Sequence, residues 1–292
     1  MADYKTIHGT TVKSYTTDPD NPIEGQVWYD KTNKVLQYQI PNVTSTGAWR
    51  TQANMNTARK ALGGAGLYTA ALAFGGNTGP GALTEQFDGS SWTEVGDLNT
   101  ARQVNGAGTV YTAALAFGYN DPSTIAEQWN GSAWTEVGDM NTSKSLSAGF
   151  GSSTSAINCG GEVSSSNSAL TELWNNSSWT EVADLNNARY SHADAGISNS
   201  SGIVFGGATP IKADAETWNG TAWTEVSNLN EGRQYAGGLG TETAALCFGG
   251  QNPPNTTEQV VEQWNGSSWT EVADISTGRR QLTGAGTSSN GL

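Results

Sequence analysis

The sequence holds few of the residues from which catalytic and metal sites are usually built. Among its 292 residues are two histidines, His8 and His192, and two cysteines, Cys159 and Cys247. A histidine-rich metal site or a repeated histidine-based triad needs more than these, so we expect no metal and no cofactor. The two cysteines fall in corresponding strands of repeats that are not neighbours, and we expect two buried free thiols rather than a disulfide.

Charge is also scarce, and basic charge most of all. Charged residues make up 14% of the chain, and 27 acidic residues against 14 basic residues give a formal net charge of −13. A field of this sign repels phosphates, so the composition disfavours nucleic acid and anionic membrane surfaces as partners. The sequence also lacks a run of 18 apolar residues and an apolar stretch near its start. We therefore expect no membrane insertion and soluble synthesis in a cytoplasm.

Glycine and tryptophan, in contrast, are abundant. The 37 glycines and 11 tryptophans indicate short strands joined by tight turns, with helix almost absent. Tryptophan recurs with spacings of 43, 42, 45, 44 and 46 residues, a period typical of propellers and solenoids, at Trp49, Trp92, Trp134, Trp179, Trp223 and Trp269. A partner aromatic stands five residues before each of the last five: Phe87, Trp129, Trp174, Trp218 and Trp264.

One repeat reads approximately LNTAR, GAGT, TAALAFGG and TEQWNGSSWTEV, and offers four short stretches suited to strands. Four strands per unit predict a propeller blade. Turns such as NGSS, NGTA or DGSS separate the paired aromatics and predict a tight hairpin with both rings on one sheet face. Such rings are suited to stacking on sugars or bases, but a large residue repeated once per blade favours packing between blades.

The two ends of the chain predict how the ring closes. After Trp269, the sequence RRQLTGAGTSS matches the innermost strand of a new blade, and the chain stops at Leu292 before a second strand. Near the start, GQVWYD, KVLQYQ and GAWRTQ match the second, third and fourth strands of a blade. We therefore predict an all-β, six-bladed propeller over residues 25–292 with four antiparallel strands per blade. A composite blade of one C-terminal and three N-terminal strands closes it, and residues 1–24 form an extended arm outside it.

Several features of the repeat occur together. An apolar run ends in a diglycine at Gly75-Gly76, Gly160-Gly161, Gly206-Gly207 and Gly249-Gly250, and the second repeat has Gly118-Tyr119 instead. A glutamate stands two residues before the first aromatic, and a basic residue opens the next unit. This combination is similar to the kelch repeat, although each unit is shorter than the roughly 50 residues typical of kelch. The resemblance implies a kelch-like β-propeller.

A basic residue opens the innermost strand of each unit: Arg59, Arg102, Lys144, Arg189, Arg233 and Arg279. Gathered around a central channel, these residues could bind an anion. In kelch repeats, however, this basic residue is part of the repeat itself. A structural role is therefore favoured, in which the basic residues pair with Glu85, Glu127, Glu172, Glu216 and Glu262.

Nearly all variation in length falls in the loop between the diglycine and the TEQW strand, which reads NTGPGAL, NDPSTIA, EVSSSNSAL, ATPIKADA and QNPPNTTEQVV. In a four-stranded meander this loop shares a face with the connection between blades. Variable loops on a rigid scaffold favour a recognition rim, although neutral drift of solvent loops gives the same pattern. No catalytic constellation accompanies the loops, and we predict that the chain is not an enzyme. A pair of carboxylates suited to glycoside hydrolysis is not excluded, because the spacing of two residues in the sequence does not give the distance between their carboxyl groups in the fold.

The segment EGQVWYDKTNKVLQYQ resembles the start of structural proteins of tailed phages of aquatic bacteria, several of which continue into WNGSAWTEV-type repeats. The resemblance implies a virion location, in a tail fibre, a baseplate or a capsid decoration. Residues 1–24 would then contact other virion proteins, and the rim would contact a host-surface glycan or receptor with avidity from multiple copies. The alternatives are a kelch-type adaptor that binds a peptide at the channel mouth and a glycan hydrolase.

Overall fold

The computed structural model describes residues 13–15, 27–30, 32, 34–38, 48–77, 81–118, 123–208, 210–254 and 256–292. Every regular element in these residues is a β-strand, as the glycine and aromatic content predicts. A helix that could span a membrane is absent from the same residues. The chain divides into two compact units, residues 1–46 and residues 47–292, and this boundary lies further along the chain than the predicted one near residue 24.

The N-terminal unit contains one small sheet. Strand β2 (Val27–Asp30) pairs antiparallel with β3 (Val35–Tyr38), so the predicted strands GQVWYD and KVLQYQ form a hairpin. Strand β1 (Lys13–Tyr15) pairs parallel with β2. The rest of the predicted arm over residues 1–24 lies outside the described residues.

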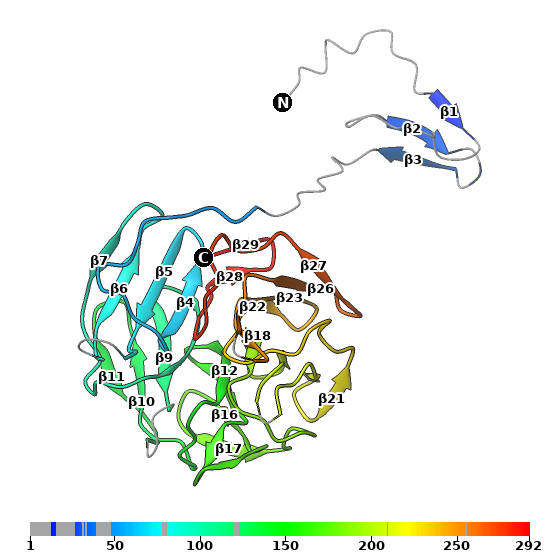
Figure 1. The fold of residues 1–292 in the computed structure, drawn as a ribbon. Coiled ribbons are helices and arrows are strands. Elements are labelled where there is room, and N and C mark those ends of the chain that lie inside the picture. Colours follow the sequence, from blue (N-terminus) through cyan, green and yellow to red (C-terminus); the bar gives the residue numbers. More distant parts are fainter. Residues whose placement is uncertain are drawn as a thin grey trace. The chain divides into compact units, whose positions relative to one another are not determined.

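The C-terminal unit is a β-propeller whose blades follow one another around a centre (Figure 1). The first blade comprises β4 (Gly63–Leu67), β5 (Ala70–Phe74), β6 (Thr84–Phe87) and β7 (Trp92–Glu94). The second comprises β8 (Asn105–Val110), β9 (Ala113–Phe117), β10 (Ala126–Trp129) and β11 (Trp134–Glu136). The third comprises β12 (Ala148–Ser152), β13 (Ser155–Cys159), β16 (Thr171–Trp174) and β17 (Trp179–Val182).

The fourth blade comprises β18 (Ala193–Ser198), β19 (Ser201–Phe205), β20 (Ala215–Trp218) and β21 (Trp223–Val226). The fifth comprises β22 (Gly237–Thr241), β23 (Ala244–Phe248), β26 (Val261–Trp264) and β27 (Trp269–Val272). Two short hairpins extend the loops between second and third strands: β14 (Glu162–Val163) with β15 (Ser166–Asn167), and β24 (Gln251–Asn252) with β25 (Thr256–Thr257). Each blade is an antiparallel meander, so the predicted four-stranded blade is confirmed.

The prediction of six blades is wrong, because the described residues form five four-stranded blades. The C-terminal segment, predicted as the innermost strand of a sixth blade, does lie between β22 and β4. There it folds back on itself as the hairpin of β28 (Gly286–Thr287) and β29 (Asn290–Gly291). Strands β2 and β3, predicted to supply those outer strands, form a separate sheet with β1 in which β2 is the central strand, and the composite blade is not observed among the described residues.

The paired aromatics follow from the hairpin that joins the third and fourth strands of a blade. In the second blade, the Asn130 side-chain oxygen accepts hydrogen bonds from the amides of Ser132 and Ala133, and Gly131 adopts a φ of 96°. This turn places Trp129 directly opposite Trp134, with ring centroids 5.5 Å apart. The predicted placement of both rings on one face is confirmed.

The core lies between the faces of adjacent blades. The ring of Phe74 in the first blade packs against Trp134 in the second, and Phe117 in the second packs against Trp179 in the third. The first tryptophan of the pair is fully buried in four blades: Trp129, Trp174, Trp218 and Trp264. These contacts show that the aromatic pairs form the inter-blade core rather than a stacking surface. Cys159 and Cys247 are buried free thiols, as predicted.

Candidate functional site

The basic residues that open the innermost strands lie within the blades, where five of the six form buried ion pairs. The pairs are Arg59–Glu85, Arg102–Glu127, Lys144–Glu172, Arg189–Glu216 and Arg233–Glu262, with side chains at most 2% exposed. In the fourth blade, the Arg189 guanidinium lies 2.7 Å from Glu216 Oε1 and also donates to the carbonyl oxygens of Gly206 and Asp214. Each basic side chain is thereby fixed inside its own blade.

The glutamates of these pairs also hold the connection that enters the blade. Glu216 Oε2 accepts hydrogen bonds from the Asn186 amide at 2.8 Å and from the Asn186 side chain at 2.9 Å, and Oε1 accepts from the Asn187 amide. A buried carboxylate is tolerated when its oxygens are satisfied in this way. The geometry therefore favours the structural role for these five basic residues.

Two of the six positions do not hold a buried arginine: one of the five ion-paired residues is a lysine, and the sixth basic residue is an exposed arginine. Lys144 Nζ lies 3.4 Å from Glu172, and burial lowers the pKa of Lys144 although Glu172 opposes the change. Arg279 is exposed and has no ion pair with any part of the chain that the structure describes. The predicted anion-binding ring is thus reduced to one accessible guanidinium.

The variable loops share a face with the connections between blades, as predicted. In the fourth blade, Tyr190 of the connection pairs with Ala208 of the loop, and the Arg233 amide donates to the Lys212 carbonyl. Equivalent contacts recur in the first, third and fifth blades. Residues 78–80, 119–122, 209 and 255 of these loops lie outside the described residues.

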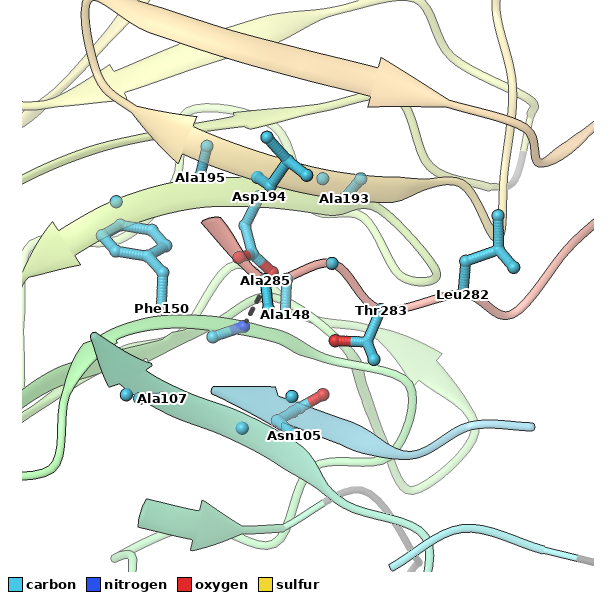
Figure 2. Close-up of a pocket in the computed structure, with 18 of the residues that line it drawn as sticks. Asn105, Ala107, Ala148, Phe150, Ala193, Asp194, Ala195, Leu282, Thr283 and Ala285 are labelled. Carbon is cyan, nitrogen blue, oxygen red and sulfur yellow. Dashed lines mark hydrogen bonds between the residues drawn. The ribbon is translucent and has the colours of Figure 1, made fainter. Parts of the chain in front are cut away.

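A cavity of about 220 Å³ lies at the centre of the propeller and is lined by the innermost strands and the C-terminal segment (Figure 2). At one mouth, the residue two positions after the basic residue has a positive φ of 51° to 57° in Ala61, Leu146, Ser191, Tyr235 and Gln281. Their backbones form a chain of hydrogen bonds from Leu146 through Ser191, Tyr235 and Gln281 to Ala61. The last of these bonds, from the Ala61 amide to the Gln281 carbonyl at 3.3 Å, joins the two ends of the propeller.

The second position of each innermost strand is glycine in every blade but one. These glycines are Gly64, Gly106, Gly149, Gly238 and Gly284, the last in the C-terminal segment. A Cβ at Gly106 would lie 2.8 Å from the Gly64 backbone nitrogen, and a Cβ at Gly238 would lie 2.1 Å from the Asp194 backbone oxygen. Adjacent innermost strands therefore approach too closely for a side chain at most of these positions.

Asp194 occupies this position in the fourth blade. Its Oδ2 accepts a hydrogen bond of 3.1 Å from the Gly149 amide of the third blade, as Figure 2 shows. Burial raises the pKa of Asp194 to about 7, although the bond from Gly149 opposes the rise. Among the residues that line the cavity, Asp194 is the sole aspartate, glutamate, lysine or arginine.

His192 lies two residues before Asp194 and also faces the third blade. Its Nε2 lies 3.9 Å from the Sγ of Cys159, and its Nδ1 is buried without a hydrogen-bond partner. Burial, with the charges of Arg189 and Lys144, lowers the pKa of His192 to about 3, and burial raises the pKa of the Cys159 thiol. Both groups are therefore neutral near pH 7, whereas a reactive cysteine requires a thiolate.

Asp194, His192 and Ser191 are not among the site residues predicted from the sequence. The signal for Asp194 is present in the sequence: ADAG stands in the fourth repeat, where the other repeats and the C-terminal segment read GGAG, NGAG, AGFG, GGLG and TGAG. The difference matters because residue 194 lies beside the channel, and the sequence of the repeat does not show which of its positions do so. The described residues contain no cluster of three or more histidine, cysteine or acidic side chains that could hold a metal.

Comparisons with known proteins agree with the propeller fold and extend no further. No protein-family model matches the chain, and no curated protein matches it. A solved structure titled "Structure of YjhT" superposes with a TM-score of 0.65 at 11% sequence identity, over 80% of this chain and 88% of that chain. At this level of identity the likeness establishes a shared β-propeller architecture.

Proposed function

We propose that this chain is a non-enzymatic structural protein of a tailed-phage virion, in which a kelch-like propeller presents a binding rim. The resemblance of the segment EGQVWYDKTNKVLQYQ to the start of tailed-phage structural proteins supports the virion location. The recurring diglycine, glutamate, tryptophan and basic residue support the kelch-like repeat. The rim would contact a host-surface glycan or receptor, or a neighbouring virion protein. The N-terminal unit would contact other virion proteins.

The observation that carries the binding role is the contrast between uniform blades and variable loops on one face. The blades repeat the same ion pair and the same aromatic pair, whereas the loops between second and third strands differ in length and include the hairpins β14–β15 and β24–β25. A rigid scaffold with variable loops is the usual basis of a recognition surface. Each contact would be weak, and several copies on one particle would raise avidity.

Cryo-electron microscopy of native assemblies that contain this chain tests the proposal. We expect the propeller on a phage particle, with the N-terminal unit against another virion protein and the variable loops facing outward. In the same assemblies, replacing residues 251–260 by the shorter loop of the fourth blade should weaken attachment while the propeller stays folded. A free propeller, or attachment unaffected by loop exchange, would contradict the proposal.

Two alternatives make different predictions. A kelch-type adaptor would bind one defined peptide at the channel mouth, beside the exposed Arg279. A glycan hydrolase using rim carboxylates would release sugar from a polysaccharide. Peptide binding with no virion association would favour the adaptor, and release of reducing ends would favour the hydrolase.

A further inference from the structure

The exposed large apolar side chains of the described residues gather at one mouth of the channel. They are 38% to 56% exposed: Leu67, Tyr68, Val110 and Ile197. Each lies in or beside the turn between the first and second strands of its blade, on the face opposite the variable loops. Leu67 and Ile197 line the central cavity, which places them at the same mouth. A Cβ at Gly66 would lie 3.2 Å from the Tyr111 nitrogen, so the turns of the first two blades touch. The four exposed residues form the apolar mouth.

The turns do not require apolar residues at these positions. Leu67 and Val110 each belong to the last residue pair before the turn, and the equivalent residues elsewhere carry a hydroxyl: Ser152, Ser198, Thr241 and Thr287. Each of those hydroxyls lies within hydrogen-bonding distance of a second hydroxyl two residues later. Ile197 is the extra residue of a β-bulge, and Thr109 takes that place in the second blade. The apolar mouth is therefore added to a turn that works without it.

Charge is nearly absent from the same face. Its turns are residues 67–69, 109–112, 152–155, 197–200, 241–243 and 287–289 between first and second strands, and residues 88–91, 130–133, 175–178, 219–222 and 265–268 between third and fourth strands. Asp88 and Glu242 are the only charged residues in these turns, which are otherwise rich in serine, threonine, asparagine and glycine.

The circumference of the propeller is acidic instead. The outermost strand of every blade carries an exposed glutamate: Glu94, Glu136, Glu181, Glu225 and Glu271. With a net charge of −13, two copies repel each other when they approach edge to edge. The face that holds the apolar mouth is where this repulsion is smallest.

We propose that the apolar mouth is the centre of a face-to-face dimer, in which two copies of this chain meet about a two-fold axis. A second copy presents the same uncharged and apolar surface, which is what the charge distribution requires of a partner. A standard interface buries about 800 Å² on each partner, which is more than four side chains provide, so the surrounding uncharged turns take part in the contact. The variable loops of both copies then point away from the interface. The dimer does not depend on the virion proposal.

Sedimentation velocity of the full chain over a range of concentrations tests the proposal. We expect a monomer–dimer equilibrium that shifts toward dimer as sodium chloride is raised, because salt screens the repulsion between two acidic copies. A chain that stays monomeric up to about 100 μM, where even a weak specific dimer is populated, would overturn the proposal. A dimer that salt dissociates would be held by ion pairs, and this result would also overturn it.

Three substitutions locate the contact on the apolar mouth. Leu67→Thr, Val110→Thr and Ile197→Thr each introduce a residue that an equivalent turn already holds, so the melting temperature should stay unchanged. We expect each substitution to raise the dimer dissociation constant by about tenfold, and the triple variant to be monomeric. Val163→Thr is the matched control, because Val163 is a partly exposed apolar residue of β14 on the opposite face, and it should leave dimerisation unchanged.

Hydrogen exchange at increasing protein concentration gives a readout that needs no substitution. The amides of residues 67–69 and 109–112 should exchange more slowly as the dimer forms, whereas those of the β14–β15 hairpin should not change. Dimerisation that persists in the triple variant, or that is lost in Val163→Thr, would overturn the assignment. Protection confined to the variable loops would do the same, because it would place the contact on the opposite face.

Discussion

Asp194 and His192 oppose each other in the dependence of stability on pH. The folded-state pKa of Asp194 is raised from 3.8 to about 7, so the folded state holds an extra proton and stability falls as pH rises through that interval. The folded-state pKa of His192 is lowered from 6.5 to about 3, so stability rises with pH between those values. The two pH intervals overlap, so between about pH 4 and pH 6.5 the fall in stability due to Asp194 and the rise due to His192 largely cancel.

Single substitutions should separate the contributions of Asp194 and His192 to the dependence of the unfolding free energy on pH. We expect the unfolding free energy of Asp194→Asn, relative to wild type, to increase from pH 4 to pH 7, and that of His192→Leu to decrease from pH 3 to pH 6.5. Each slope is at most about 1.4 kcal/mol per pH unit, the value for one proton. Urea denaturation across this pH range measures both, and parallel profiles for the two variants and wild type would contradict the assignment.

The buried ion pairs make a second prediction at the scale of residues. Glu216→Gln leaves the Arg189 guanidinium buried without its counter-ion and weakens two bonds to Asn186, and should destabilise the protein by about 3–5 kcal/mol. Arg279→Ala is the matched control, because this exposed arginine lacks an ion pair in the described residues and should change stability by less than about 0.5 kcal/mol. Equal effects in guanidinium denaturation would refute the structural role of the pair.

At the scale of elements, the diglycine that follows the second strand in four of the five blades combines a backbone requirement with a steric one. Gly206 has a φ of 71°, and a Cβ there would lie 2.5 Å from the Arg233 carbonyl oxygen. Gly131 in a hairpin turn also has a positive φ, but the nearest atom to its Cβ would be 3.4 Å away. We expect Gly131→Ala to cost about 1–2 kcal/mol and Gly206→Ala clearly more, as measured by thermal unfolding. Similar costs would mean that the Arg233 backbone moves aside.

The repeat pattern predicted the blades because the signals are local. Aromatic pairs five residues apart recur in every blade, and tight turns such as Asn-Gly and diglycines recur in most of them, so the signals for all five complete blades lie within about 40 residues of each other. The sixth blade failed because its strands lie at opposite ends of the chain, and β28 has a nearer partner in β29. The channel seam could not be predicted, because Asp194 reaches Gly149, and His192 reaches Cys159, only once two blades pack together.

At the scale of the whole molecule, the ring is closed by the C-terminal segment. Leu292 and Ala285 pair through their backbones and pack near Ala71 and Phe87 of the first blade. Removing residues 281–292 should therefore expose the innermost strands β22 and β4, which the segment separates. We expect faster hydrogen exchange at the amides of β22 and β4, with β12 on the far side still protected. Uniform exchange across all innermost strands would contradict a local role for this segment.

The chain enters the propeller near Trp49 and leaves it near Leu292, and the positions of these two points determine how the propeller responds to mechanical load. Trp49 packs against the fifth blade and Leu292 lies with the first, so both exits stand at the same seam. Tension applied between them acts on the Ala61–Gln281 hydrogen bond and the contacts around it before it reaches any complete blade. A pulled molecule should open at this seam in one short extension and then unravel blade by blade, in five longer steps of similar length.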